Sequence, residues 1–172
     1  MLKFIVEKFK RYHLKDVAVK DERVLAFQNL EAAKECVLFW VADDISWTEV
    51  DKIRKSLAKY MEVHLLSFIR QSKSVFERSG DALYADESSI TYGGKIRDAK
   101  LREVLEKTEG VFIDISMQPD VLGDYIVRYA KSPCKVGISR EGVEHDIMFA
   151  NVRNTDVFVD RLFKLFTKIN TY

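Results

Sequence analysis

The sequence is poor in residues that break or cross-link a chain. Its 172 residues include 2 prolines, 7 glycines and 2 cysteines, and they contain no low-complexity tract and no internal repeat. No apolar run approaches the roughly 20 residues of a membrane-spanning helix, and the N-terminus lacks the apolar core and cleavage site of a secretion signal. We therefore expect a soluble cytoplasmic protein with one globular domain at residues 21–172, preceded by a helix at residues 1–20.

Cysteine is scarce, and so are patterns that bind metals. Cys36 and Cys134 lie inside apolar runs, where a small buried side chain is expected before a disulfide or a catalytic thiol. Two such thiols favour a reducing compartment. His64 has no second ligand at metal-binding spacing, so we predict no metal site and no cofactor.

An excess of either charge is also absent, because 28 Lys and Arg residues face 27 Asp and Glu residues. Nucleic-acid-binding domains are distinctly basic, so this balance argues against a nucleic-acid partner. The basic residues gather at the start of the chain. Residues 1–20 hold six basic and two acidic side chains, which leaves 22 basic and 25 acidic side chains in residues 21–172.

The basic segment carries apolar residues at helical spacing, namely Leu2, Ile5, Val6 and Phe9. This spacing predicts an amphipathic helix. We expect its apolar face to pack on the domain's own sheet. Two alternatives stay open: the helix lies on an anionic membrane surface at the inner face of the membrane, or it enters a groove of a protein partner.

Residues 111–139 have the pattern of a strand, a helix and a second strand. An apolar run is followed by a helix that starts at Pro119, by a Ser132-Pro133 stop, and by another apolar run. Parallel strands need such a helical crossover, so the segment predicts a βαβ unit.

A second βαβ unit precedes the first in the chain. Residues 36–42 and 63–69 are apolar runs, and the helix between them opens with a capping box of Ser46 and Glu49. Runs that are apolar on both faces are typical of central parallel strands. The sequence therefore predicts a three-layer Rossmann-like α/β fold, with a mostly parallel sheet of five or six strands and helices on both faces.

The elements between these units are less regular. Residues 17–27 are expected to be irregular or to include one short strand at 24–27. We predict a short helix at 74–78 inside the polar segment 71–89, and a helix at 97–107. Gly93-Gly94 lacks the spacing of a phosphate-binding loop and predicts a tight turn.

Two elements close the chain. The strand at 147–149 follows a connection too short for a helical crossover, so we expect an antiparallel edge strand or a strand after a bend. A final helix, capped by Asn154 or Thr155, should seal one face of the sheet. The same helix could instead form the seam of a homodimer.

Polar residues follow the predicted parallel strands at their carboxyl ends, where open α/β sheets bind ligands. The candidate ligand-binding residues are Asp43, Asp44, Ser46, Arg70, Ser116, Gln118, Ser139 and Arg140. The arginines suit a phosphate or nucleotide-like group, and the two aspartates suit a cation. Polar residues also stand at strand ends simply because the chain leaves the core there.

Asp114 differs from these residues because it lies inside an apolar strand. A buried carboxylate needs donors that offset its desolvation, and a helix N-terminus or neighbouring backbone can supply them. A catalytic role requires a second titratable group, for which His145 and Asp146 are the candidates. The sequence contains no nucleophile elbow and no glycosidase-like carboxylate pair, so we assign no catalytic residue.

Four segments carry a resemblance: FQNLEAAKECVLFWVADD, ITYGGKIRDAKLREVLEKTEGVFIDIS, YIVRYAKSPCKVGIS and HDIMF. Over residues 25–169 the chain resembles a family of small bacterial single-domain α/β proteins of unknown function. This resemblance implies a similar fold and a cytoplasmic location, and it supplies no catalytic residues. Residues 111–142 are more distantly similar to the N-terminal Rossmann-like half of heptosyltransferase-type glycosyltransferases. This chain lacks the C-terminal half that holds the nucleotide sugar, so their activity is not implied.

Two functions follow from these patterns. The first is a non-enzymatic interaction or accessory module that binds a protein partner or a membrane surface. The second is an enzyme or small-ligand binder with its site at the carboxyl ends of the strands. The absence of catalytic spacing favours the first, and an exposed apolar N-terminal helix beside a flat sheet edge would support it further.

Overall fold

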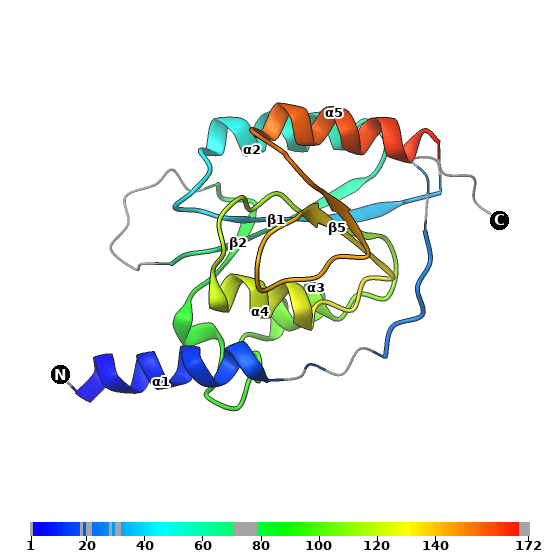
Figure 1. Ribbon diagram of the computed structural model, residues 1–172. Coiled ribbons are helices and arrows are strands. Elements are labelled where there is room, and N and C mark those ends of the chain that lie inside the picture. The colour runs from blue at the N-terminus through cyan, green and yellow to red at the C-terminus, as the bar shows by residue number, and fades with distance from the viewer. Residues whose placement is uncertain are drawn as a thin grey trace.

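The computed structural model describes residues 2–17, 19, 22–27, 29, 32–70 and 79–168. Six strands form one sheet in the order β3-β2-β1-β4-β5-β6, and every neighbouring pair is parallel. The strands are β1 (Glu35–Val41), β2 (Glu62–Phe68), β3 (Ala82–Ala85), β4 (Val111–Asp114), β5 (Cys134–Ile138) and β6 (Ile147–Phe149). The Rossmann-like α/β fold predicted from the sequence is confirmed (Figure 1).

Helices cover both faces of the sheet. They are α1 (Leu2–Asp16), α2 (Trp47–Leu57), α3 (Ala99–Leu105), α4 (Val121–Tyr129) and α5 (Thr155–Phe166), with a short 3-10 helix η1 (Glu87–Ser89). Figure 1 shows α2 and α5 above the sheet and α3 and α4 below it. Because strand side chains alternate, Leu38 and Trp40 of β1 join the core beneath α2 and α5, and Val37 and Phe39 join the other core. No helix of the described chain has the length and apolar character needed to cross a membrane.

Local signals in the sequence set several element ends. The capping box at α2 is present, with Glu49 N donating to Ser46 Oγ at 3.3 Å. Asn154 caps α5. The predicted tight turn is also present, because Gly94 N donates to Thr91 O at 3.0 Å and Gly94 has a φ of 80°. These predictions are confirmed.

The last strand differs from the prediction of an antiparallel edge. β6 pairs parallel with β5, with Met148 opposite Gly137. The connection at residues 139–146 has no helix, but in extended form it spans roughly 26 Å, enough to run back along β5. At its end, Lys135 N donates to Asp146 Oδ2 at 2.7 Å, which fixes the chain beside the start of β5. The chain therefore enters both strands from the same end, and the antiparallel prediction was wrong.

Two further predictions concern irregular segments. The helix predicted at 74–78 lies outside the described residues, whereas the rest of that polar segment contains β3 and η1. Residues 24–27, which were expected to be irregular or to form a short strand, are irregular. One backbone hydrogen bond, from Ala26 N to Pro133 O at 3.1 Å, connects them to the start of β5.

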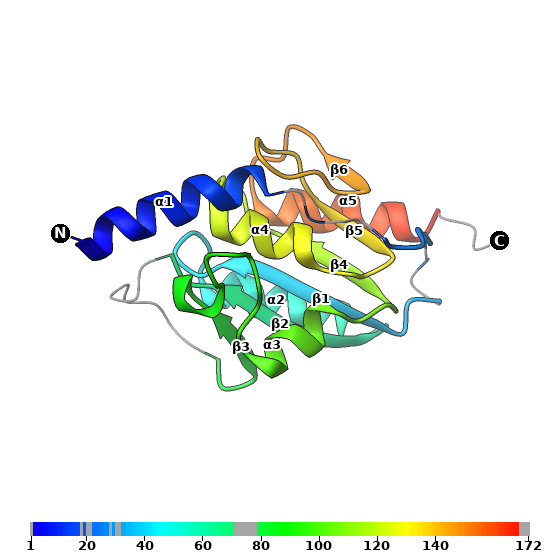
Figure 2. The same ribbon diagram turned by 90° about the horizontal axis from the view of Figure 1, so that it is seen from below.

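α1 lies along α4 and not on the sheet (Figure 2). Leu14 is fully buried in the core on the α3 and α4 side. Ile5, Val6 and Phe9, which were expected to face the sheet, are instead exposed to 44%, 53% and 60%. The prediction that this apolar face packs on the sheet was therefore wrong.

Candidate functional site

The strand order reverses between β1 and β4, which are neighbours in the sheet although β2 and β3 separate them in the chain. In open α/β sheets this reversal opens a crevice that binds ligands. Three groups of predicted residues meet here: Asp43 and Asp44 after β1, Arg70 after β2, and Ser116 after β4. We refer to this end of the sheet as the carboxyl rim.

Arg70 lies across the crevice. Its Nη1 and Nη2 bind the two carboxylate oxygens of Asp44 at 2.9 and 2.8 Å, and its Nε binds Asp120 Oδ2 at 3.0 Å. The backbone N of Arg70 also donates to Asp43 Oδ2 at 2.8 Å. The hydrogen bonds that Arg70 donates to Asp44 raise the pKa of Arg70. A phosphate that entered the crevice would meet an arginine whose charge two carboxylates already neutralise.

The N-terminus of α4 is occupied in the same way. Free amides at such a helix end bind the phosphates of nucleotides in many α/β folds. Here Asp120 Oδ1 accepts from Leu122 N at 3.1 Å and from Gly123 N at 2.9 Å. The chain's own carboxylate therefore takes the place that a ligand phosphate would take.

A second ionic cluster lies below the rim between β4, β5 and α4. Asp114 is fully buried, and its Oδ2 accepts from Arg140 Nη2 at 2.6 Å and from His145 Nε2 at 2.9 Å. Its Oδ1 accepts from Ser116 N at 2.9 Å. Arg140 Nη2 also binds Asp124 Oδ1 at 2.7 Å. Of the two titratable groups considered as neighbours of Asp114, His145 and Asp146, the structure places His145 beside it.

Burial and charge act differently on the two aspartates of this cluster. Burial raises the pKa of Asp114, but the hydrogen bond from His145 and the charge of Arg140 outweigh it, so the pKa lies below its ordinary value. Burial also raises the pKa of Asp124, and there the Arg140 charge offsets burial only in part, so the pKa stays above its ordinary value. The cluster holds two carboxylates, one guanidinium and the imidazole of His145.

Gly137 makes room for this arrangement. A Cβ built on Gly137 would lie 2.3 Å from His145 Nε2, so the imidazole rests directly on the glycine of β5. The side chains of His145 and Asp114 have no exposed surface. Ser116 Oγ and His145 Nδ1 are buried and have no hydrogen-bond partner among the described residues. The side chains of Asp114 and His145 therefore offer no surface to a substrate in this conformation, and the hydrogen bonds of the cluster connect β4, α4 and the residues that follow β5.

The remaining predicted residues do not join either cluster. Ser46 caps α2, Gln118 is exposed on the loop before α4, and Ser139 follows β5 with its backbone N donating to Phe149 O. Asp146, the other suggested neighbour of Asp114, pairs with Arg23 at 2.8 Å.

Sequence reasoning missed the two aspartates of α4 that complete the clusters, Asp120 and Asp124. A signal for both was present. Asp120 follows Pro119 at the helix start, where an N-cap is expected, and Asp124 stands four residues later on the same helix face.

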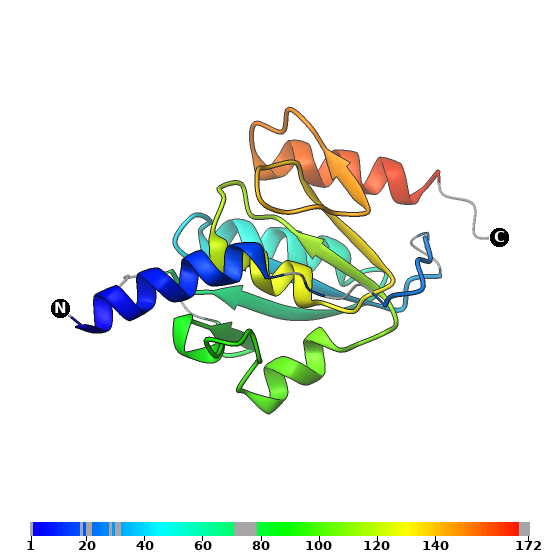
Figure 3. The ribbon, with the colours of Figure 1, turned by 60° about the horizontal axis from the view of Figure 1, so that its bottom comes forward.

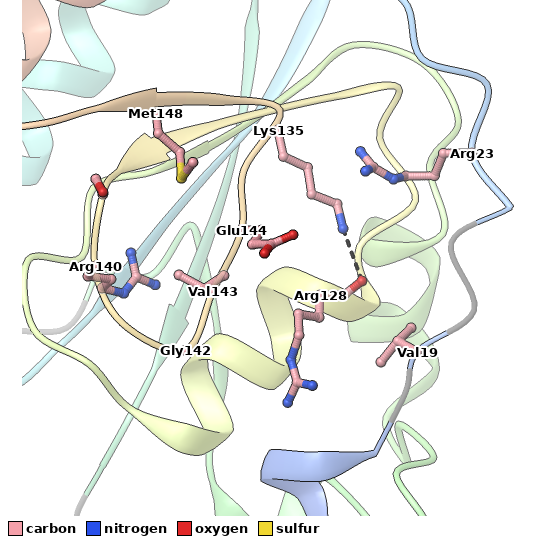
Figure 4. Close-up of a pocket in the computed structure, with 10 residues that line it drawn as sticks. Val19, Arg23, Arg128, Lys135, Arg140, Gly142, Val143, Glu144 and Met148 are labelled. Atoms are coloured by element: carbon pink, nitrogen blue, oxygen red, sulfur yellow. Dashed lines mark hydrogen bonds between the residues drawn. The ribbon is translucent and has the colours of Figure 1, made fainter.

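A cavity of about 660 Å³ lies between α4, β5 and the loop before β6 (Figure 4). Its charged lining residues are Arg23, Arg128, Lys135, Arg140 and Glu144. Figure 4 shows the Glu144 carboxylate between Arg140 and Lys135, and the Lys135 Nζ bond to Arg128 O, which measures 3.0 Å. Four of these five charged lining residues are basic, so the cavity is cationic.

No group of three or more His, Cys, Asp or Glu side chains in the described part of the chain is placed to hold a metal ion. No curated protein and no solved structure matches the chain. The more distant similarity to heptosyltransferase-type enzymes therefore stays a prediction. One family, described as a family of unknown function (DUF6913), matches residues 3–169, nearly the full length. The chain belongs to this family of unknown function.

Proposed function

We propose that the protein is a non-enzymatic interaction module, acting in the bacterial cytoplasm, that docks on another surface through the outward face of α1. One observation carries the proposal. Four large apolar side chains of α1, which we call the apolar stripe, are exposed: Ile5 to 44%, Val6 to 53%, Phe9 to 60% and Tyr12 to 73%. An apolar patch that stays uncovered on one helix is typical of a binding surface.

The stripe points away from the body because of how α1 is anchored. With about 100° between successive residues of a helix, Ile5, Phe9 and Tyr12 stand on the side opposite the buried Leu14. The anchored side combines this buried leucine with an ion pair, in which Arg11 binds Glu87 of η1 at 3.1 Å.

Arg128 of α4 holds the C-terminal end of α1. Its guanidinium donates to the backbone oxygens of Leu14 at 2.7 Å and Val17 at 3.1 Å. A cation at a helix C-terminus also complements the helix dipole. These polar contacts hold α1 in an orientation that leaves its apolar stripe exposed.

The carboxyl rim supports the same proposal. Arg70 and Arg140 are paired with carboxylates, and Asp120 caps α4, so the groups that would recognise a phosphate are engaged within the chain. The rim then acts as a rigid base for α4, on which α1 lies.

The proposal can be tested by photo-crosslinking in cells. Benzoylphenylalanine incorporated at position 9 should give a crosslinked product, because Phe9 lies in the stripe. The same residue at position 148 is the matched control, since Met148 is exposed to 50% on β6, away from α1. Equal products from both positions, or none from position 9, would contradict docking through α1.

A second candidate function, binding of a small anion, is favoured by the cavity beside β5. Arg128 lines it, forms no ion pair with another described residue, and has a buried Nε without a partner there. Its positive charge is met by backbone oxygens and by the ring of Tyr125, whose centroid lies 5.5 Å from the guanidinium carbon, and by no carboxylate of the described chain. A phosphate-sized anion would add the missing charge.

Thermal unfolding with inorganic phosphate and pyrophosphate tests this candidate, because a ligand of the native state raises the midpoint by mass action. Glu144→Gln removes the exposed carboxylate that lines the cavity, so it should increase the shift. Glu109→Gln, at an exposed site after α3, should leave the shift unchanged. An absence of any shift in all three proteins would reject the anion site.

A further inference from the structure

We propose that the surface on which α1 docks is an anionic phospholipid membrane, with α1 lying flat in the headgroup region. This inference rests on the proposed function and names its partner. Helices that bind membranes in this way carry Phe, Leu or Tyr on one face and Lys or Arg beside it. The described part of the protein supplies both features on one side of the molecule.

A second element extends the apolar stripe. Tyr92, from the turn between η1 and α3, is exposed to 50% and stacks on His13 of α1, with ring centroids 5.1 Å apart and planes 8° from parallel. Tyrosine favours the boundary between water and lipid because its ring is apolar and its hydroxyl is polar. The turn therefore adds an aromatic contact next to the helix.

The shape of this side suits a planar partner. Figure 1 shows α1 along the lower border of the molecule, with the turn around Tyr92 beside it and no other labelled element below them. Figure 3, from a different side, shows the same helix in front of α4, with its N-terminal half projecting beyond the rest of the fold. A flat surface can thus touch α1 along its length without meeting another helix or strand.

Basic side chains flank the stripe. Lys8 and Lys15 are exposed and stand roughly 40–60° round the helix from Tyr12. Lys95 is exposed on the turn that carries Tyr92. Long lysine side chains reach phosphate headgroups while neighbouring apolar groups enter the lipid, so these three residues complement an anionic membrane.

The distribution of charge over the whole sequence points the same way. Residues 1–20 carry an excess of four positive charges, whereas residues 21–172 carry an excess of three negative charges. An anionic surface attracts the first region and repels the second. The protein would therefore approach such a membrane with α1 foremost.

Other occupants fit less well. A second copy of the chain would bring two helices together that each carry five basic and two acidic residues between positions 2 and 16, and like charges at that distance repel. A stable protein interface involves about 20–30 residues on each side, far more than the stripe and its turn provide.

Vesicle co-sedimentation of the full chain tests the proposal. Wild type should bind vesicles of phosphatidylcholine with 30% phosphatidylserine at least tenfold more tightly than vesicles of phosphatidylcholine alone, and salt should weaken the binding. The double variant Ile5→Ser and Phe9→Ser should lose at least tenfold in binding to the anionic vesicles. Met148→Ser removes an equally exposed apolar side chain from β6 and should bind like wild type.

Two further variants separate the contributions and guard against a folding defect. Tyr92→Ser changes the turn and leaves α1 intact, and it should weaken binding several-fold. The triple variant Lys8→Gln, Lys15→Gln and Lys95→Gln should reduce binding to the anionic vesicles to the level seen with neutral ones. Equal binding by wild type and all these variants would overturn the proposal.

The failure of this inference differs from the failure of the proposed function. If wild type ignores both kinds of vesicle while position 9 still crosslinks to a protein in cells, the membrane is wrong and docking through α1 stands. If sedimentation equilibrium shows a dimer that the Ile5 and Phe9 changes dissociate, the occupant is a second copy. If position 9 yields no product and vesicles do not bind, both proposals fail.

Discussion

The carboxyl end of the sheet and α1 are both unusual in what they bury: the first buries charged side chains, and the second exposes apolar ones. At the rim, charged side chains are buried: Asp114 is 0% exposed and Arg140 is 3% exposed. On α1, apolar side chains are in solvent, with Phe9 at 60% and Tyr12 at 73%. Buried charges and exposed apolar patches are the informative exceptions in a protein. The two regions differ in one respect: the buried charges have partners within the chain, whereas the exposed apolar side chains of α1 do not have them within the described residues.

The buried charges at the carboxyl end of the sheet are paired with groups of the same chain. Each buried carboxylate there has a cationic or amide donor, so no external ligand is needed to offset desolvation. The stripe has no such compensation within the described chain. This contrast is why we place the interaction on α1 and treat the rim as its support.

The largest expected loss of stability comes from a substitution in the buried ionic cluster. Asp114→Asn removes one charge from the cluster and replaces one accepting oxygen with an NH2 group, although Arg140, His145 and Ser116 N all donate to this side chain. Breaking a buried ion pair in this way costs about 3–5 kcal/mol of unfolding free energy. Denaturant unfolding at pH 7 measures the loss. Asp81→Asn, at an exposed site, is the control and should change little; an equally small effect at Asp114 would show that the cluster does not stabilise the fold.

The same pair of proteins should respond differently to acid. The pKa of Asp114 is lower in the folded protein than in the unfolded chain, so its stabilising contribution is present above the ordinary value of about 3.9 and is lost as pH falls through the folded value. The gap between wild type and Asp114→Asn should therefore be constant from pH 7 to about 5 and shrink below about 4. Asp124, whose pKa is raised, acts in the opposite direction in both proteins. A gap that widens in acid would refute this assignment.

A smaller loss is expected from Gly137→Ala. The added methyl group would lie 2.3 Å from His145 Nε2, so the imidazole must move off Asp114. Overpacking of this kind costs about 1–3 kcal/mol, measured by the same unfolding curves. Gly93→Ala meets nothing within 4 Å and serves as the reference. If the two substitutions cost the same, His145 does not rest on Gly137.

Periodicity in the sequence was enough to predict the layered fold. The apolar runs at β1, β4 and β5 and the second half of β2 are buried on both faces, and this pattern depends only on side chains close together in the chain. Caps such as Ser46 and Asn154 were predicted for the same reason.

Features set by distant contacts escaped prediction. The direction of β6 depends on Asp146 meeting Lys135 N eleven residues earlier, and no local pattern encodes it. Helical periodicity identified the apolar face of α1, but not which side would be covered, because that depends on Glu87 and Arg128. Arg70 and Arg140 were among the predicted residues, whereas their pairing with Asp120 and Asp124 depended on the register of α4 against the sheet.

The smallest expected effect comes from the exposed side of the comparison. Ile5→Ser with Phe9→Ser removes apolar groups that the described chain does not cover, so the unfolding free energy should change by less than about 0.5 kcal/mol. Leu14→Ala, on the buried side of the same helix, should cost about 2–5 kcal/mol, because it leaves a cavity against α4. Thermal and denaturant unfolding of the isolated protein compare the two. A large loss from the stripe variant would mean that the stripe packs within the fold, and α1 would then have no free face with which to dock.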